Sequence, residues 1–315
     1  MKNINPLVSV IIPCFNHEKF IEARIKSIIQ QTYNNIEIIL IDDNSSDSSP
    51  KIIKQYEKMN NVFAIYNKKS LGPFYAHNLG VNYSNGDYLL FAESDDISNP
   101  QLIELLLNTK FFDSNIAVSY SKSAIINEND KIIAEDFHHR EKKFRKLYLH
   151  SGVIPREKAR EFLLVGNIIP NMSAALIKKS VFQNAGGLDT KYRLCADWDL
   201  WMKISLNHDF YYVNKSLNYF RIHQSTVRFK FKYREIYETY SIIIEQYNKQ
   251  KLGFIRRQKI KNNIAYNWVS YVLFHPIISF KTSKNLINKV LFFDPLFFIR
   301  FIGVGLVKIF KVPIK

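Results

Sequence analysis

The chain has 315 residues, 47% of them hydrophobic, which is typical of a globular protein with a substantial core and excludes a disordered chain. Its 44 basic and 28 acidic residues give a net charge of +16, so we expect an anionic partner: nucleic acid, anionic lipid or a phosphorylated substrate. Its two cysteines, Cys14 and Cys195, are too few for a disulfide framework and suit a reducing compartment.

The first part of the chain, up to about residue 120, repeats a short apolar run followed by a helical pattern. The apolar runs cover 8–12, 36–41, 62–66 and 88–92. The helical patterns cover 18–31, a segment beginning near 50, a segment ending near 83, and 100–107. Buried strands that alternate with helices predict an α/β fold whose strands lie parallel in one sheet.

Polar or acidic clusters directly follow three of these apolar runs, at 13–16, 42–45 and 93–96. In an open parallel sheet, ligands bind in the crevice outside the carboxyl ends of the strands. The sequence therefore predicts that the three clusters form one site at that edge of the sheet.

The middle of the chain is less regular. Strands are predicted at 116–120, 132–134, 172–177, 211–213 and 219–222, and helices at 179–185 and 198–206. Gly186 and Gly187 are expected to end the first of these helices, and Asp197 directly precedes the second. The charge-rich segment 138–146 is predicted to be a loop.

From about residue 229 the pattern becomes helical, basic and aromatic to the end of the chain. The apolar segment 290–312 is interrupted by Asp294, Pro295, Arg300 and Lys308, which argues against a membrane-spanning helix. Two interpretations remain open: an amphipathic segment lying on an anionic membrane, or a helix packed against the rest of the protein.

Several motifs in order along the chain carry a resemblance to a known family. They are the segments 8–16, 27–33, 37–48, 76–80, 86–88, 93–96, 186–189, 196–201 and 221–223. Together they resemble family 2 glycosyltransferases over residues 7–225. The resemblance implies a GT-A fold, a Rossmann-like and mostly parallel sheet flanked by helices. We expect a catalytic domain at 1–225, with a nucleotide-binding half at 1–120 and an acceptor-binding half at 121–225, followed by a helical extension at 226–315.

The resemblance implies a nucleotide pocket at the strand ends. Asp43 would accept the N3–H of uracil, although the 42–48 cluster could simply cap the next helix. The other residues expected to contact the nucleotide are Pro13, Phe15, Asn16, His77, Asn78, Ser94 and Asp95. His77 stands where relatives commonly carry Arg, so it departs from the family pattern.

A metal site is implied by Glu93-Ser94-Asp95-Asp96, which stands at the family's Asp-x-Asp element. Asp95 is the expected first ligand of Mn²⁺ or Mg²⁺, with Glu93 and His223 as further ligands. A bare acidic cluster could instead be a solvated turn, and a lone histidine a structural residue.

Asp197 is the expected catalytic base, removing a proton from the acceptor hydroxyl in an inverting transfer, and it could also serve as a helix cap. Asp199 is the less favoured base. The residues expected near the donor or acceptor sugar are Asp96, Asn171, Trp198, Asp199 and Arg221. Trp198 could equally be a core residue.

The expected function is therefore metal-dependent, inverting transfer of a hexosyl or N-acetylhexosaminyl group from a UDP-sugar. The expected acceptor is a glycan or lipid-linked glycan of a bacterial surface polysaccharide, such as lipopolysaccharide O-antigen or capsule. No signal peptide pattern follows Met1, so we expect a cytoplasmic protein attached peripherally to the inner face of the membrane.

Three other classes of protein were weighed. A catalytically degenerate GT-A protein acting as a membrane-bound scaffold is the main alternative. A sugar-phosphate nucleotidyltransferase is disfavoured, since its Gly-rich N-terminal loop is absent, and no nucleic-acid partner is expected because no binding motif accompanies the charge.

Overall fold

The computed structural model describes residues 5–107, 115–135, 148–223 and 232–248, together with short stretches within 253–265 and 288–302. The chain divides into two compact units, Met1–Thr226 and Val227–Lys315. The predicted loop at 138–146 lies outside the described residues, as does the end of the apolar segment from 303 onward.

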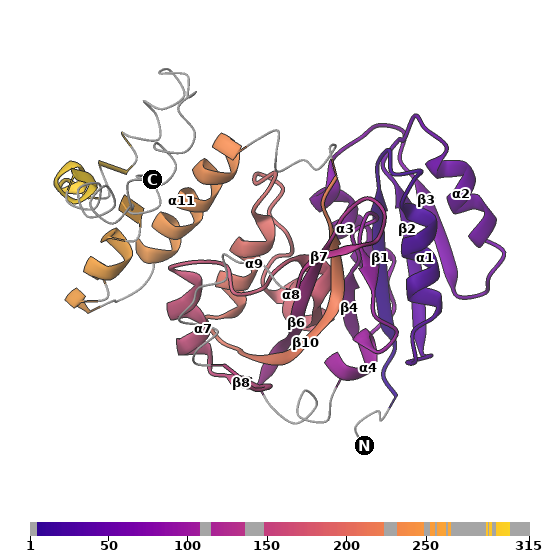
Figure 1. Ribbon diagram of the computed structural model, residues 1–315, viewed down its shortest axis with the longest axis horizontal. Helices are drawn as coiled ribbons and strands as arrows, with labels where there is room; N and C mark the ends of the chain where they lie inside the picture. Colours follow the sequence, from indigo (N-terminus) through magenta and orange to yellow (C-terminus); the bar gives the residue numbers. More distant parts are fainter. Residues whose placement is uncertain are drawn as a thin grey trace. The chain divides into compact units, whose positions relative to one another are not determined.

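The first unit is built on one mixed sheet (Figure 1), with the strand order β3-β2-β1-β4-β9-β6-β10-β5. The N-terminal elements are β1 (Val8–Cys14), α1 (Ile21–Ile29), β2 (Ile36–Asp42), α2 (Ser49–Tyr56), β3 (Val62–Tyr66), α3 (Pro73–Tyr83) and β4 (Tyr88–Phe91). The next are β5 (Ile97–Ser98), α4 (Leu102–Leu106), β6 (Ile116–Ile126), β7 (Ile132–Ala134), β8 (Gly152–Ile154) and α7 (Arg156–Leu163). The unit closes with η1 (Met172–Ala174), β9 (Ala175–Lys178), α8 (Lys179–Asn184), α9 (Ala196–Ile204) and β10 (Asp209–Arg221).

The N-terminal strands form the parallel sheet that the sequence predicts. β1 pairs in parallel with both β2 and β4, and β2 pairs in parallel with β3. Every residue of β1 and β2 is buried, because helices cover both faces of the sheet. On one face, Val10 and Ile12 pack with Ile25 of α1 and Ile103 of α4. The α/β fold is confirmed.

On the opposite face, α3 packs closely against β1 at a glycine. A Cβ atom placed on Gly80 would lie 2.4 Å from Cγ2 of Ile11. Only a residue without a side chain allows this approach, so Gly80 fixes the distance between helix and sheet.

Strand direction in the second half decides which loops meet. β9 runs antiparallel to β4 and to β6, and β10 runs parallel to β6. β10 therefore points the same way as β4 and β1. Its carboxyl end lies at the same edge of the sheet as theirs, although it is separated from β1 by most of the domain's sequence.

Several boundaries differ from those predicted. The two short strands expected at 211–213 and 219–222 are one strand, β10, with register shifts between Val213 and Asn218 that break the alternating pattern. The strand expected from 172 begins with the short helix η1, and β6 extends to Ile126. Asp197 lies inside the first turn of α9 rather than before it.

The second unit contains α11 (Lys232–Asn248), whose Tyr240 and Ile243 are buried. Asp294 is also buried and lies 2.8 Å from Nε of Arg300 and 3.5 Å from Nζ of Lys261. Within the described residues, no helix is long and apolar enough to cross a membrane. Apolar side chains at least half exposed in this unit are Phe254, Ile255, Leu296, Phe298, Ile299 and Ile302.

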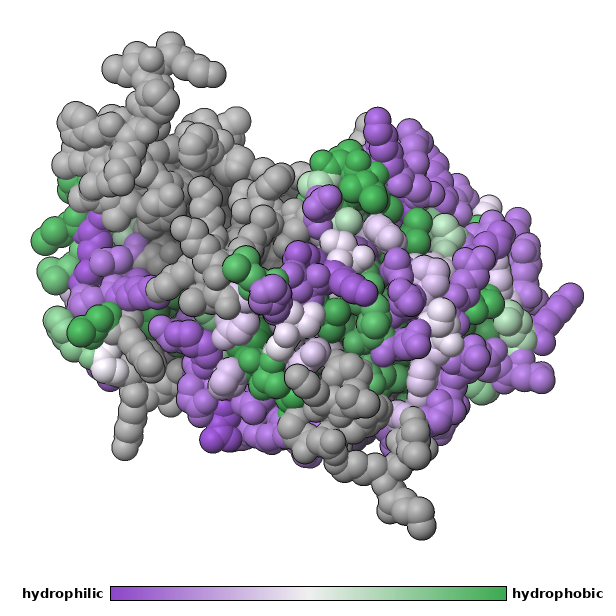
Figure 2. All heavy atoms as spheres, turned by 60° about the horizontal axis from the view of Figure 1, so that its bottom comes forward, coloured by the Kyte–Doolittle hydropathy of each residue, from purple (hydrophilic) through white to green (hydrophobic). Residues whose placement is uncertain are grey.

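In the first unit, by contrast, hydrophilic residues dominate the side on which α1 and α2 lie, at the right of Figure 2. Exposed apolar residues there occur in small groups between charged ones. Such scattered groups are usual for a soluble surface and need no partner to explain them.

Candidate active site

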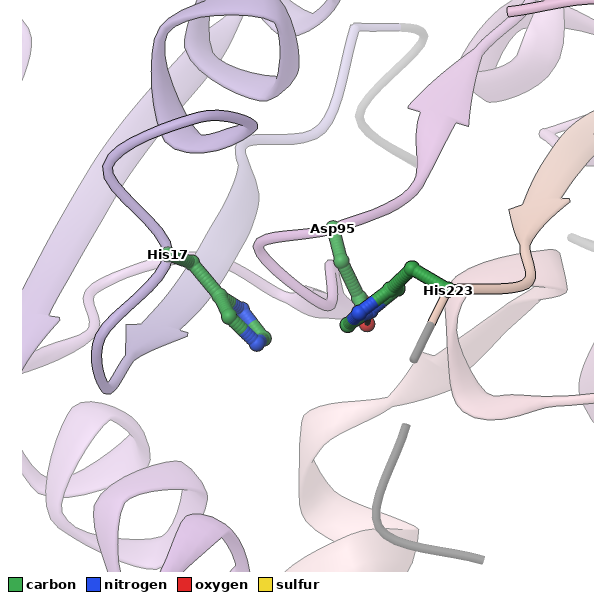
Figure 3. Close-up of side chains that lie close together, drawn as sticks. All are labelled: His17, Asp95 and His223. Atoms are coloured by element: carbon green, nitrogen blue, oxygen red, sulfur yellow. Dashed lines mark hydrogen bonds and ion pairs between the residues drawn. The ribbon is translucent and has the colours of Figure 1, made fainter. Parts of the chain in front are cut away.

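Three side chains from distant parts of the chain meet at the carboxyl edge of the sheet (Figure 3). They are His17 from the loop after β1, Asp95 from the loop after β4, and His223, two residues beyond β10. Each offers one metal-ligating atom, and these atoms lie within 4.8 Å of one another. Asp95 and His223 were predicted from the sequence, whereas His17 was not.

His17 is held in place by the neighbouring loops. Its Nδ1 lies 2.7 Å from Oγ of Ser94, and its backbone N–H donates to Oγ of Ser49 at 3.1 Å. The preceding Asn16 has a positive φ of 55°, a conformation that asparagine adopts more readily than most residues, and its side chain accepts the N–H of Ser46 at 2.8 Å. The first two loops are therefore tied together beneath His17.

His223 and Asp95 form the tightest pair of the cluster. Nε2 of His223 lies 2.9 Å from Oδ2 of Asp95, and the His223 ring packs against Phe20 with the ring centroids 4.8 Å apart. Burial alone would raise the pKa of Asp95, but the interactions led by the hydrogen bond with His223 hold that pKa below its usual value. Burial lowers the pKa of His17, which favours a neutral imidazole able to donate a lone pair.

A buried arginine lies beneath the acidic loop. Arg24 of α1 is fully buried, and its Nη1 donates to Oγ of Ser98 at 2.7 Å. Burial lowers its pKa, and the charges of Asp96, Glu93 and Asp95 act in the opposite direction. Its Nε and Nη2 have no hydrogen-bond partner among the described protein atoms, so its charge is balanced by neighbouring carboxylates rather than by a salt bridge.

Glu93 is the member of the acidic loop whose charge is most disfavoured. Burial, followed by the charges of Asp95 and Asp96, raises its pKa to about 8. Its Oε1 lies 3.5 Å from Nε2 of His77, a fully buried ring whose pKa burial lowers to about 3. His77 therefore lies behind the acidic loop, with no exposed surface through which a nucleotide could touch it.

Asp96 joins the acidic loop to the second half of the sheet. Its carboxylate accepts hydrogen bonds from Nδ2 of Asn171 at 3.1 Å, Nδ2 of Asn218 at 3.3 Å and the backbone N–H of Arg221 at 3.1 Å. Burial and the charge of Asp95 raise its pKa to about 6. Asp96 and Asn171 were both expected near the sugar, but they are 1% and 5% exposed. In the structure their side chains are hydrogen-bonded to each other and connect the acidic loop to the second half of the domain.

Arg221 is also occupied by protein contacts. Its Nε donates to the backbone oxygen of Asp95 at 2.7 Å, and its Nη1 donates to the backbone oxygen of Asn127 at 3.0 Å and pairs with Asp130. Its guanidinium carbon lies 4.9 Å from the centroid of the Phe20 ring. In this arrangement Arg221, which was expected near the donor or acceptor sugar, fixes the backbone of Asp95.

The residues expected to bind the nucleotide divide into exposed and enclosed ones. Phe15 is 47% exposed and Asn16 is exposed as well, whereas Pro13 is buried within β1. Asn78 receives the backbone N–H of Leu188 and donates to the oxygen of the same residue, which secures the turn after α8.

Asp43, which was expected to bind the uracil base, fixes the loop of residues 67–72 in the structure. Its carboxylate accepts the backbone N–H groups of Leu71 and Gly72, Oγ of Ser70 at 2.8 Å and Nδ2 of Asn67 at 2.8 Å. Gly72 has a φ of +95°, which lets the chain turn its N–H toward this carboxylate. The contact with uracil stays a prediction.

Two aspartates of α9 are distinguished by their surroundings. Asp197 is buried in the first turn, where the helix N-terminus stabilises a negative charge, and its charge acts on Glu93. Asp199 is paired with Lys203 at 2.6 Å. Trp198 donates its indole N–H to the backbone oxygen of Leu163 at 3.0 Å, so that edge of the ring is used in packing. Of these two aspartates, Asp197 is therefore the one whose charge acts on the acidic loop, whereas Asp199 is paired within its own helix.

Comparison with known proteins identifies the family and the fold of the chain. The glycosyl transferase family 2 model matches residues 9–182. A protein of Haemophilus influenzae described as an uncharacterized glycosyltransferase is 28% identical over 282 residues, covering 86% of this chain and 85% of its own length. Glycosyltransferase GlyA of Streptococcus pneumoniae is 25% identical over 230 residues, covering 71% of this chain and 32% of its own.

Solved structures share the fold at low sequence identity. S. aureus TarS in complex with UDP-GlcNAc superposes with a TM-score of 0.69 at 16% identity, over 91% of this chain and 80% of TarS as crystallised. A mannosyltransferase from Pyrobaculum calidifontis in complex with GDP-Man and Mn²⁺ gives a TM-score of 0.59 at 12% identity, over 96% of this chain and 88% of its own.

Proposed function

This chain belongs to glycosyl transferase family 2 and is a glycosyltransferase, and on that premise we propose that it transfers a sugar from a UDP-sugar, with metal assistance and inversion of the anomeric centre. The proposed acceptor is a glycan or lipid-linked glycan of a cell-surface polysaccharide. The UDP-GlcNAc complex of a protein with the same fold supports a uridine donor.

The observation that carries the proposal is the meeting of His17, Asp95 and His223 at the carboxyl edge of the sheet. Their donors fit a divalent ion. Two adjacent ligands at about 2.1 Å from a metal are about 3 Å apart, and Nε2 of His223 and Oδ2 of Asp95 are separated by 2.9 Å. An ion bound there would stabilise the charge on the departing nucleoside diphosphate.

Asp197 is proposed to remove the proton from the acceptor hydroxyl. A base must remain ionised until the hydroxyl arrives, and the N-terminus of α9 favours the charged carboxylate. Lys203 pairs with Asp199 and so reduces the competition from the second aspartate of the helix. Inversion requires that the base and the departing nucleoside diphosphate lie on opposite sides of the reacting sugar carbon.

Nucleotide recognition is proposed to involve the loops after β1 and β2. Phe15 presents an exposed ring beside the loop that carries Asp43, which suits stacking against a flat base. To meet the uracil N3–H, the Asp43 carboxylate would have to exchange one of its hydrogen bonds with residues 67–72 for one with the base.

Peripheral attachment to an anionic membrane is proposed for the second unit. Its exposed apolar residues, with the net charge of +16 for the whole chain, suit shallow insertion combined with electrostatic attraction. This would bring the acceptor, if it is lipid-linked, to the same surface as the enzyme.

Calorimetry and product analysis test the proposal together. UDP should bind in the presence of Mn²⁺ and lose affinity in chelator or in Asp95→Ala, whereas Glu22→Ala, which removes an exposed carboxylate of α1, should bind as the unchanged protein does. Proton NMR of the product from a panel of UDP-sugars should give an inverted anomeric configuration. Absence of UDP binding under every condition would refute the uridine donor, and metal-independent binding would refute the metal.

A further inference from the structure

The donor set at the site is unusual for a magnesium enzyme. Two of the three ligating side chains, His17 and His223, are imidazoles, and Asp95 supplies the one carboxylate of the set. Mg²⁺ is a hard ion that prefers oxygen ligands and retains its waters, whereas imidazole nitrogen suits the first-row transition ions.

His17 is positioned to act as a ligand before any ion arrives. Its Nδ1 is paired with Ser94, which fixes the plane of the ring and leaves Nε2 for a further partner. The rings of His17 and His223 lie nearly perpendicular to each other, with centroids 5.6 Å apart and planes at 86°. In Figure 3 its ring extends toward Asp95 and His223 rather than away from them.

The electrostatic setting does not distinguish one divalent ion from another. The fully buried Arg24 places a positive charge next to Glu93, Asp95 and Asp96, which partly cancels the field of the acidic loop and weakens the binding of Mg²⁺, Mn²⁺ and Co²⁺ alike. Selectivity among these ions therefore depends on the nitrogen donors.

We propose that His17 is a metal ligand and that the pair His17 and His223 makes the site select a transition ion, in the affinity order Mg²⁺ below Mn²⁺ below Co²⁺. The inference rests on the proposed function only in taking the cluster to be the metal site of a glycosyltransferase. If His17 were purely structural, its role would be limited to the hydrogen bond with Ser94, and its ring would not bind the ion.

The test measures ion binding in the full-length protein without nucleotide. Free Mn²⁺ is followed by electron paramagnetic resonance, and Co²⁺ and Mg²⁺ by competition against it. Co²⁺ should bind at least about 100-fold more tightly than Mg²⁺. His17→Asp exchanges a nitrogen donor for an oxygen donor. The ratio of Co²⁺ affinity to Mg²⁺ affinity should therefore fall at least about 10-fold, which is the usual size of the change in metal affinity when the surroundings of a metal are altered. His150→Gln, which removes an exposed histidine elsewhere, should leave the ratio unchanged.

A spectroscopic count of nitrogen ligands gives an independent readout. Electron spin echo modulation of bound Mn²⁺ should detect two imidazole nitrogens in the unchanged protein and one in His17→Asn. Two nitrogens in the variant, or a Co²⁺ to Mg²⁺ ratio unaffected by His17→Asp, would overturn the proposal.

The two proposals can fail separately. If UDP-sugar is turned over but Mg²⁺ binds as well as Co²⁺, the function stands and the selectivity is wrong. If the affinity order and nitrogen count hold but no UDP-sugar reacts with any ion, the selectivity stands and the proposed function is wrong.

Discussion

Replacement of Asp96 by alanine separates a bracing role from a sugar-binding one. The substitution removes the acceptor of three hydrogen bonds, whose donors lie on Asn171, Asn218 and Arg221. Because these residues are 5%, 0% and 2% exposed, water cannot replace the lost acceptor. Each orphaned donor costs about 1–3 kcal/mol, so three of them together cost about 6 kcal/mol.

A second contribution acts in the opposite direction. Burial raises the pKa of Asp96 to about 6, roughly two units above that of an unfolded aspartate, so keeping it ionised at neutral pH costs the folded state about 3 kcal/mol. Alanine removes that cost, and the net loss of stability near pH 7.5 is expected to be about 3 kcal/mol. The favourable contribution of a carboxyl with a raised pKa is complete below its unfolded pKa and is lost as the pH rises through 6. The destabilisation by Asp96→Ala should therefore be larger at pH 5 than at pH 7.5.

Urea unfolding followed by tryptophan fluorescence measures this effect, since Trp198 and Trp201 both lie in the first unit. Asp43→Ala is the matched control. It also removes several hydrogen bonds, but most of their donors lie in the exposed loop 67–72 and can turn to water, so a loss of about 1 kcal/mol is expected. Equal losses for the two variants, or a smaller loss for Asp96→Ala at pH 5 than at pH 7.5, would refute the reasoning.

Three further predictions concern catalysis, pH and the membrane. Asp197→Asn should retain UDP binding in calorimetry and reduce transfer at least about 100-fold, as expected for loss of a positioned base, and near-normal turnover would move that role to Asp199. In chelator, the melting temperature should fall between pH 5 and pH 8.5, because a pKa raised to about 8 makes Glu93 lose its stabilising contribution as the pH rises. The melting temperature of Glu93→Gln should fall less over this pH range. An equal fall in the variant and the unchanged protein would contradict the raised pKa of Glu93. Removing the residues after about 280 should release the protein from anionic liposomes with UDP binding intact, whereas high salt should release only part of it.

The parallel half of the fold follows from sequence because its signal is local. The strands near 8, 36, 62 and 88 are continuous apolar runs, and the structure contains each of them. β10 could not be predicted as one strand, because its irregular stretch near Ser216 interrupts the alternation that identifies strands.

Of the three clustered residues, Asp95 and His223 could be singled out from the sequence because they lie in motifs, whereas His17 is defined only by spatial proximity. His17 carries no signature beyond being a polar residue after a strand, and its partner Ser94 is 77 residues away. Arg24 was overlooked although it has a usable signal. It lies on the apolar face of α1 between Ile21 and Ile25, a position where a surface arginine is not expected. The donors that bind the carboxylates of Asp43 and Asp96 could not be predicted either, because hydrogen bonds between distant loops leave no periodicity in the sequence.

The position of His223 has a consequence for the order in which the protein becomes functional during synthesis. The strand that delivers it, β10, is the last strand of the first unit and pairs with β6, formed about a hundred residues earlier. A nascent chain can build the β1–β4 layer and present His17 and Asp95 while His223, the third residue of the proposed metal site, is still missing. An ion that binds all three residues would then favour the state in which β10 is paired with the sheet, and it would stabilise the folded domain by the free energy of binding. Metal supply could in this way govern how much of the newly made chain matures, as well as how fast the mature enzyme turns over.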